Sequence, residues 1–132
     1  MPAFIKNLTV DCADAFLLAR FWAAALGSDV DEDSTPGRAF VEAPAWGGPN
    51  IWFRGAREPK AAPNRLHLDL RPLTTMAEEV ARLVGLDATV VERFDDITVM
   101  QDPEGNEFCV EPGPGDPHEP SGRWSTILSF EW

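Results

Sequence analysis

The chain contains two similar strand-helix segments about sixty positions apart, and this repeat limits the fold more than any other feature. The two strands appear when KNLTVDCAD is set beside RLHLDLRPLT. The aligned positions are Asn7 with His67, Leu8 with Leu68, Val10 with Leu70, Asp14 with Thr74, and Leu26-Gly27 with Leu86-Asp87. Few residues are identical, but the order of apolar and polar positions holds from strand through helix. The pattern predicts a duplicated module.

Each segment opens with a strand that has one apolar and one polar face, because residue character alternates with a period of two. The apolar positions are Leu8, Val10 and Cys12 in the first segment and Leu66, Leu68 and Leu70 in the second; the polar positions between them are Asn7, Thr9, Asp11, His67, Asp69 and Arg71.

A helix follows each strand, because apolar residues recur at helical spacing. The first predicted helix has Asp14 as its N-cap and ends at Gly27, and the second opens with the capping-box spacing Thr75-x-x-Glu78 before it ends at Gly85. The apolar stripes are Leu18, Phe21, Trp22 and Ala25 in the first and Met76, Val80, Leu83 and Val84 in the second. We expect the apolar strand faces to pack on these helices and the polar faces to point away.

Three further strands are expected after each helix. They fall near residues 29–34, 38–43 and 50–54 in the first half, and near Thr89–Arg93, Ile97–Gln101 and Glu107–Glu111 in the second. In the turn before the last strand, Gly105 and Asn106 suit a positive φ.

These elements predict module one over residues 1–57 and module two over 65–113, with the proline-rich, charged segment 58–64 as a linker. The proline- and glycine-rich extension 114–132 follows and is expected to end in a short strand that covers a sheet edge or crosses to a second subunit.

The strong negative charge of the chain bears on its partners. The formal net charge of -11 and the pI near 4.4 disfavour nucleic acid and anionic membranes, and favour neutral or cationic ligands. Apolar runs long enough to span a membrane and a signal-peptide pattern are both lacking, so we expect a cytoplasmic protein. Cys12 and Cys109 are too few for a disulfide framework and fall on opposite predicted faces, which predicts free thiols.

Three pieces together, LTVDCADAFLLARFWAAALG, NRLHLDLRP and DPEGNEFCVEP, resemble the glyoxalase-like branch of the vicinal oxygen chelate superfamily. That superfamily includes glyoxalase I, extradiol dioxygenases, fosfomycin-resistance enzymes and bleomycin-resistance proteins. The resemblance covers roughly residues 4–113. It implies an α+β fold in which two tandem βαβββ modules form a curled mixed sheet around a cleft.

In metal-dependent members, the resemblance implies four ligands, two on the first strands of the modules and two on the last. The matching positions are Asn7, His67, Arg54 and Cys109. Only His67 is a ligand of the usual kind, because an arginine stays protonated and a lone Cys-His pair beside a cation is a poor site. Asp69, Glu107 and Glu111 lie one strand step, roughly 7 Å, from the matching positions. We therefore expect no metal cofactor.

The candidate ligand-binding residues share the polar strand faces. They are Asn7, Thr9, Asp11, Trp52, Arg54, His67, Asp69 and Cys109. His67 is also the candidate catalytic acid or base, and its alternative is a histidine satisfied by a nearby carboxylate. Cys109 is either a nucleophile or an inert small side chain.

The cationic and aromatic candidates also leave alternatives open. Arg54 either clamps a ligand carboxylate or phosphate, or pairs with Glu107, Glu111 or Asp11 on the same face. Trp52 can stack on a planar or cationic ligand. Trp46 is either a lid or packs at an edge.

These observations favour a metal-independent protein that binds a small aromatic or cationic molecule, for which the bleomycin-resistance proteins are the precedent that the resemblance offers. The alternative is a metal-dependent lyase, isomerase or dioxygenase-type enzyme with a divergent metal site. A third reading is an accessory module whose extension mediates dimerisation, and the resemblance leaves a homodimer open. Whether the chain is an enzyme stays undecided at this point.

Overall fold

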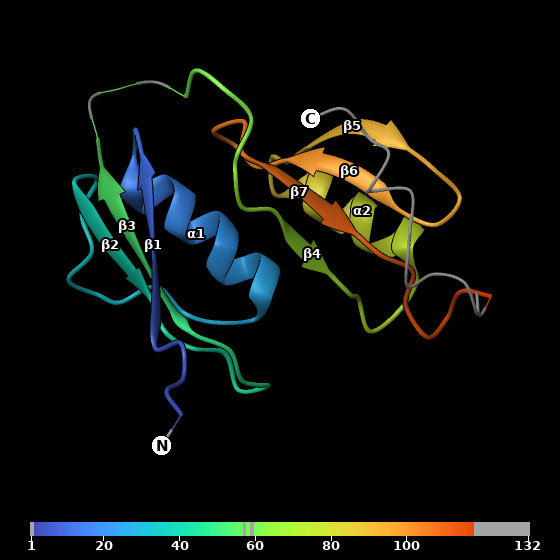
Figure 1. The fold of residues 1–132 in the computed structure, drawn as a ribbon, viewed down its shortest axis with the longest axis horizontal. Helices are drawn as coiled ribbons and strands as arrows, with labels where there is room; N and C mark the ends of the chain where they lie inside the picture. Colours follow the sequence, from blue (N-terminus) through green and yellow to red (C-terminus); the bar gives the residue numbers. More distant parts are fainter. Residues whose placement is uncertain (1, 57, 59, 118–132) are drawn as a thin grey trace. The chain divides into compact units, whose positions relative to one another are not determined.

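The computed structural model describes residues 2–56, 58 and 60–117, which form an α+β fold in two compact units that meet between Ala61 and Ala62 in the sequence (Figure 1). Unit 1 contains β1 (Asn7–Cys12), α1 (Ala15–Leu26), β2 (Arg38–Val41) and β3 (Asn50–Gly55). Unit 2 contains β4 (Leu68–Leu70), α2 (Met76–Gly85), β5 (Thr89–Arg93), β6 (Thr98–Gln101) and β7 (Glu107–Val110). The predicted fold class is confirmed.

Sheet topology supports the predicted duplication. The strand orders are β1-β3-β2 and β4-β7-β6-β5, and in both sheets the first strand runs parallel to the last. In the place of β5, unit 1 has only an isolated antiparallel bridge between Val30 and Val41. The two helix ends also match, because Gly27 and Asp87 both adopt the left-handed conformation, with φ of 70° and 80°.

The predicted strand over residues 29–34 is wrong, because this segment turns locally. The backbone N–H of Asp33 donates to the Asp31 carboxylate, and the N–H of Ser34 donates to the Asp31 carbonyl. Acidic side chains that bond to nearby backbone compete with a strand ladder in this way.

The alignment of Asp14 with Thr74 is off by one residue, because Thr75 is the N-cap that corresponds to Asp14. Asp14 accepts from the N–H of Leu17 at 3.1 Å. Thr75 accepts from the N–H of Glu78 at 3.1 Å, and its hydroxyl donates to the Glu78 carboxylate. Both caps satisfy backbone donors at the helix starts and so fix where α1 and α2 begin.

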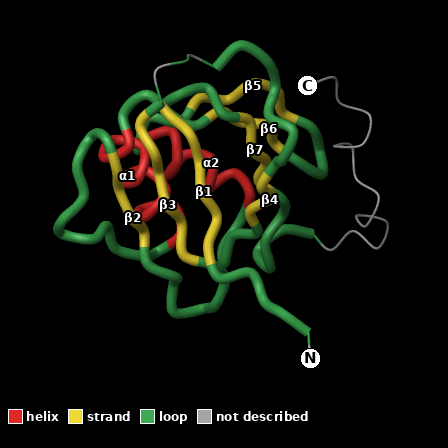
Figure 2. Tube along the Cα trace, turned by 60° about the vertical axis from the view of Figure 1, so that its left-hand side comes forward, coloured by secondary structure: helices red, strands yellow, loops and turns green. Residues whose placement is uncertain are grey.

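In unit 1, α1 lies along one face of the sheet and contacts all three strands (Figure 2). Leu18, Phe21 and Trp22 of its predicted stripe are buried. The sheet contributes further buried residues to this core, namely Cys12, Ala39, Val41, Ile51 and Phe53. Because side chains alternate along each strand, the residues between these lie on the opposite face.

In unit 2, α2 contacts β5 and β7 and buries Val80 and Leu83. Two predicted core residues are instead exposed. Leu66 is 68% exposed because β4 begins only at Leu68, and Val84 is exposed because the buried stripe of this short helix is narrow.

The turn before β7 is built on the buried Asp102. Gly105 has the predicted positive φ, of 84°, but Asn106 does not. Instead, the Asn106 side-chain amide donates to both Asp102 oxygens at 2.9 and 3.1 Å, and its backbone N–H donates to one of them. The side chain of Asn106 thus stabilises the turn through hydrogen bonds and not through its backbone conformation.

The start of the extension is docked on α2. The Asp116 carboxylate accepts from the N–H of Met76 at 2.7 Å and from that of Gly113 at 2.8 Å, and the N–H of Gly115 donates to the Thr74 carbonyl. The predicted final strand lies outside the described residues.

Both cysteines are free and buried. None of the described helices is long and apolar enough to cross a membrane.

Candidate functional site

The sheet face of unit 1 that points away from α1 gathers most of the predicted ligand-binding residues; we call it the polar face of unit 1. Strand register sets its side chains in three rows. The rows are Asn7–Asn50, Thr9–Trp52–Phe40 and Asp11–Arg54–Arg38.

In the charged row, Asp11 and Arg54 form a two-pronged ion pair. The Arg54 Nε and Nη2 donate to the two Asp11 oxygens at 2.8 and 3.0 Å. The hydrogen bond from Arg54 holds the pKa of the Asp11 carboxyl below its usual value. Of the alternatives for Arg54, the structure therefore has the pairing with Asp11. The pair remains accessible, with side-chain exposures of 68% for Arg54 and 54% for Asp11.

The middle row is aromatic. The ring centroids of Trp52 and Phe40 are 4.5 Å apart, and the Arg38 guanidinium carbon lies 4.7 Å from the Trp52 ring centroid. Sequence reasoning found Trp52 but missed Phe40 and Arg38. The signal was present, because the buried Ala39 and Val41 alternate with them and assign them to the other face.

The two asparagines of the amide row form a hydrogen bond with each other, and Asn50 forms another with the backbone. The Asn50 amide donates to the Asn7 side-chain oxygen at 3.0 Å, and the Asn50 oxygen accepts from the N–H of Ala43 at 2.8 Å. Trp46 lies apart from these rows, since its indole N–H donates to the Leu26 carbonyl at the end of α1 at 2.9 Å.

In unit 2, Asp69 of β4 lies opposite Cys109 of β7. Cys109 is 0% exposed, and burial, followed by the charges of Asp69 and Glu111, raises the pKa of its thiol to about 12. Burial also raises the pKa of the Asp69 carboxyl, against the charge of His67, which lowers it. The Cys109 thiol is therefore protonated at neutral pH, which disfavours both the nucleophile and the thiolate ligand.

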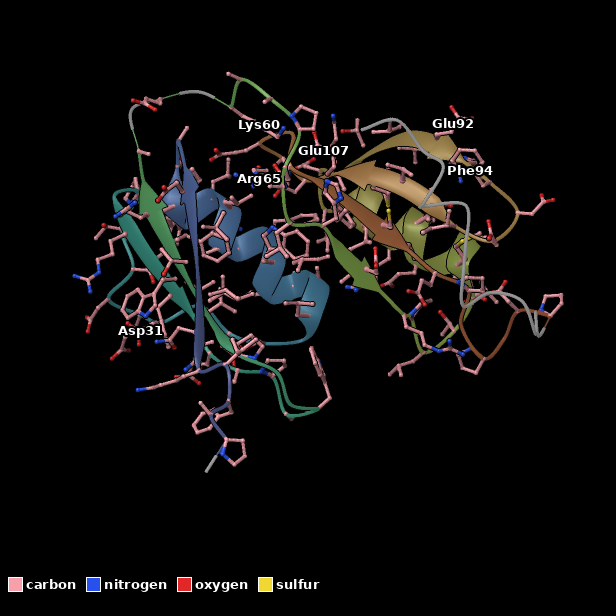
Figure 3. The ribbon with its side chains drawn as sticks, viewed as in Figure 1. Asp31, Lys60, Arg65, Glu92, Phe94 and Glu107 are labelled. Atoms are coloured by element: carbon pink, nitrogen blue, oxygen red, sulfur yellow. The ribbon has the colours of Figure 1, made fainter. Side chains whose placement is uncertain are left out.

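His67 and Glu107 lie near the start of the same strands. The His67 Nε2 atom is buried, and no hydrogen bond reaches that atom from the described residues, although the residue has other interactions. Glu107, labelled in Figure 3, accepts from the backbone N–H of Asn64 at 2.8 Å. Glu107 thus fixes the end of the predicted linker to β7.

The sheet face of unit 2 that carries Cys109 is not polar throughout, contrary to expectation. Ile97, Val99 and Cys109 form a buried cluster, and Phe94, labelled in Figure 3, packs against it. The reason is that the two central strands, β6 and β7, are buried on both faces. The continuous apolar run Phe-Cys-Val of β7 is typical of such a strand.

Register also changes which positions correspond between the units. Cys109 pairs with Asp69, and the residue equivalent to Asp69 is Thr9, which pairs with Trp52. Trp52, and not Arg54, is therefore the counterpart of Cys109.

The residues at the positions that the family uses for metal do not fit a divalent ion. Trp52 offers no metal donor, Arg54 stays protonated, and the oxygen of Asn7 already accepts a hydrogen bond. Cys109 is fully buried and shares the set with no second donor except His67, which alone is a ligand of the usual kind. Among the described residues, no group of three or more His, Cys, Asp and Glu side chains is placed to hold a metal ion.

Comparison with known proteins gives one family. A family model described as a glyoxalase-like domain matches residues 7–111. No curated protein matches the chain.

Solved structures share the fold at low sequence identity. A glyoxalase/bleomycin resistance protein/dioxygenase family enzyme from Burkholderia phytofirmans PsJN has a TM-score of 0.65 and 15% identity, over 84% of this chain and 98% of that one. A glyoxalase-related enzyme from Fulvimarina pelagi has a TM-score of 0.64 and 15% identity, over 85% and 88%. A lactoylglutathione lyase from Agrobacterium tumefaciens has a TM-score of 0.56 and 15% identity, over 94% and 98%. These likenesses concern the fold alone.

Proposed function

Because the chain belongs to the glyoxalase-like domain family, we propose that it binds a small aromatic or cationic molecule on the polar face of unit 1 without a conventional metal site. The observation that carries the proposal is the Trp52–Phe40 pair on the polar face of unit 1. Large aromatic side chains gain most when they are buried in a core. On this face they are only partly buried, beside exposed Thr9 and Asp11, which suits a surface that stacks on a ligand.

The chemistry of the metal positions supports binding without a metal. A divalent ion needs several deprotonated or neutral donors, and only His67 supplies one of the usual kind. The net charge of -11 supports a second part of the proposal, that nucleic acid and membrane surfaces are not partners.

The binding proposal is tested with aromatic probes and two matched tryptophan variants. Ligand-observed NMR with 2-naphthol and 2-naphthylmethylammonium should show transfer from the wild-type protein. Trp52→Leu should abolish the transfer, whereas Trp46→Leu, which removes an exposed tryptophan outside the polar face, should leave it unchanged. Transfer that survives Trp52→Leu, or no transfer from either probe, would contradict the proposal.

A second candidate function is a metal-dependent lyase, isomerase or dioxygenase-type enzyme. The observation that favours it is the electrostatic interaction of the Asp69 carboxyl on β4 with the His67 imidazole, which lies just before that strand. The structural neighbour from Agrobacterium tumefaciens, titled a lactoylglutathione lyase, is an enzyme with this fold.

The enzyme candidate predicts that Ni²⁺, Mn²⁺, Zn²⁺ or Fe²⁺ raises the melting temperature and that His67→Ala cancels the rise. Metal analysis of untagged protein gives the second readout. If none of the four ions changes the melting temperature and no ion copurifies in stoichiometric amount, this candidate fails and the metal-independent proposal stands.

A further inference from the structure

Two arginines lie directly opposite each other on the polar face of unit 1. Register places Arg38 of β2 against Arg54 of β3. Like charges directly opposite on neighbouring strands destabilise the pairing. Asp11 neutralises one of them, since both of its oxygens bond to Arg54. In a protein of net charge -11, this row therefore keeps one positive charge that no neighbour in the row balances.

The surplus charge is held on an aromatic surface. The Arg38 guanidinium lies 4.7 Å from the Trp52 ring centroid, and within the described part of the chain no carboxylate pairs with it. Trp52 packs in turn on Phe40. A guanidinium that lies over a ring without a carboxylate partner can still use its N–H groups to bind a planar anion in two-pronged fashion. Stacking also lowers the entropy lost when an anion binds.

We infer that the ligand of this face is a planar aromatic molecule with a carboxylate, and that Arg38 is the residue that selects the carboxylate. The inference rests on the proposed binding function and adds the charge of the ligand to it. The carboxylate bonds to the N–H groups of Arg38, and the aromatic part packs beside Trp52 and Phe40. Trp52 acts both as a ring contact and as the residue that positions Arg38. A cationic ligand would instead meet the charge of Arg38 at close range.

The test compares three probes of one shape and different charge on the full chain: 2-naphthoate, 2-naphthamide and 2-naphthylmethylammonium. Isothermal titration calorimetry should show that 2-naphthoate binds roughly tenfold or more tighter than the amide, as expected for hydrogen bonds between charged groups. Arg38→Gln should remove this preference and leave the weak binding of the amide. Arg38→Lys should keep only part of it, because an ammonium keeps the charge but lacks the planar pair of donors.

Arg20→Gln is the matched control. Arg20 also lies over an aromatic ring, 5.9 Å from the centroid of Phe16, but on α1 and outside the polar face. This variant should keep the full preference for 2-naphthoate. Thermal melts of all variants report whether each one folds, and if Arg38→Gln does not fold, Arg38→Lys decides.

Failure of the inference is distinguishable from failure of the proposed function. If none of the three probes binds, the proposed function fails and the inference with it. If the probes bind with equal affinity, or the Arg38 variants keep the wild-type preference, the inference alone is overturned. Tighter binding of 2-naphthylmethylammonium also overturns it, in favour of a cationic ligand.

Discussion

Asp69 and Cys109 lie opposite each other on the parallel strands β4 and β7, so that a carboxylate stands beside a fully buried thiol. Burial and this carboxylate act in the same direction on the thiol, because both disfavour a thiolate. Register and burial together make Cys109 a protonated residue of the sheet interior.

The first prediction is that Cys109 resists alkylation. In a Cys12→Ala variant, Cys109 is the sole cysteine, and iodoacetamide at pH 8 should label it far more slowly than a free thiol, because the reactive species is the thiolate. Asp69→Asn should accelerate the labelling only slightly, since burial is the larger cause of the raised pKa. Mass spectrometry gives the rates, and denatured protein gives the control for full labelling. Rapid labelling of the native protein would contradict the assignment.

The same thiol predicts how stability depends on alkaline pH. In the folded chain the pKa of Cys109 is about 12, above the ordinary value of 9.0. Between these two values the unfolded chain loses the proton that the folded chain retains, so the free energy of unfolding falls as pH rises. The chain has no tyrosine, which removes one other kind of group that titrates in this range.

Urea unfolding at several pH values from 8 to 11 should therefore show a decline that Cys109→Ala flattens. An equal slope in the two proteins would mean that other groups cause the alkaline loss.

Acid titration tests the exposed ion pair on the polar face of unit 1. Carbon-detected NMR should give Asp11 a pKa below its ordinary value, and Arg54→Gln should return it toward that value, because the hydrogen bond from Arg54 is the main cause. Since the folded pKa is lowered, the pair stabilises the fold above the unfolded pKa, and this contribution is lost as pH falls. The pair is exposed, so the effect on stability should be small. Arg38→Gln is the control and should leave the Asp11 titration nearly unchanged.

Much of the fold could be predicted from the sequence because its signals are local. The caps at Asp14 and Thr75 and the left-handed end at Gly27 follow from residue type and spacing. Gly85 was the expected end of the second helix, but the left-handed residue there is Asp87. The strand near residue 30 could not be rejected in this way. Val30 is its one apolar residue, and the hydrogen bonds of Asp31 decide against a strand.

The candidate site was only partly predictable, because it depends on register between distant strands. Alternation assigns Asp11 and Arg54 to polar faces, but only the pairing of β1 with β3 brings them within hydrogen-bond distance. Trp52 likewise could be recognised as the counterpart of Cys109 only from the strand registers in the two sheets. Arg38 belongs to no sequence motif, and its position over the Trp52 ring follows from the tertiary structure alone.

Gly113, directly before the extension and outside the matched family segment, gives a stability prediction. A Cβ on Gly113 would stand 2.3 Å from the Thr74 carbonyl oxygen and 2.8 Å from that of Pro72, so Gly113→Ala must displace the backbone. It should lower the free energy of unfolding by about 1–3 kcal/mol. Gly85→Ala is the matched control in the same unit, because its Cβ would meet nothing within 4 Å. It should raise stability by about 0.5–1 kcal/mol. If the two variants are equally stable, the docking of the extension contributes nothing to the fold.

Asp87 predicts a substitution that stabilises the chain. It is the one described non-glycine residue with a positive φ, at 80°, and the equivalent position at the end of α1 is Gly27, at 70°. A residue with a Cβ is strained in this conformation, and glycine is not. Asp87→Gly should therefore raise the free energy of unfolding by roughly 1 kcal/mol, and Gly27→Ala should lower it by a similar amount.

The charge of Asp87 gives a second reason for instability, since a carboxylate at a helix C-terminus is unfavourable. Asp87→Asn separates the two causes, because it removes the charge and keeps the Cβ. Urea unfolding followed by circular dichroism should place Asp87→Asn between the wild type and Asp87→Gly. If Asp87→Asn equals Asp87→Gly, charge and not backbone strain limits this helix end, and the conformational match between Gly27 and Asp87 carries no energetic cost.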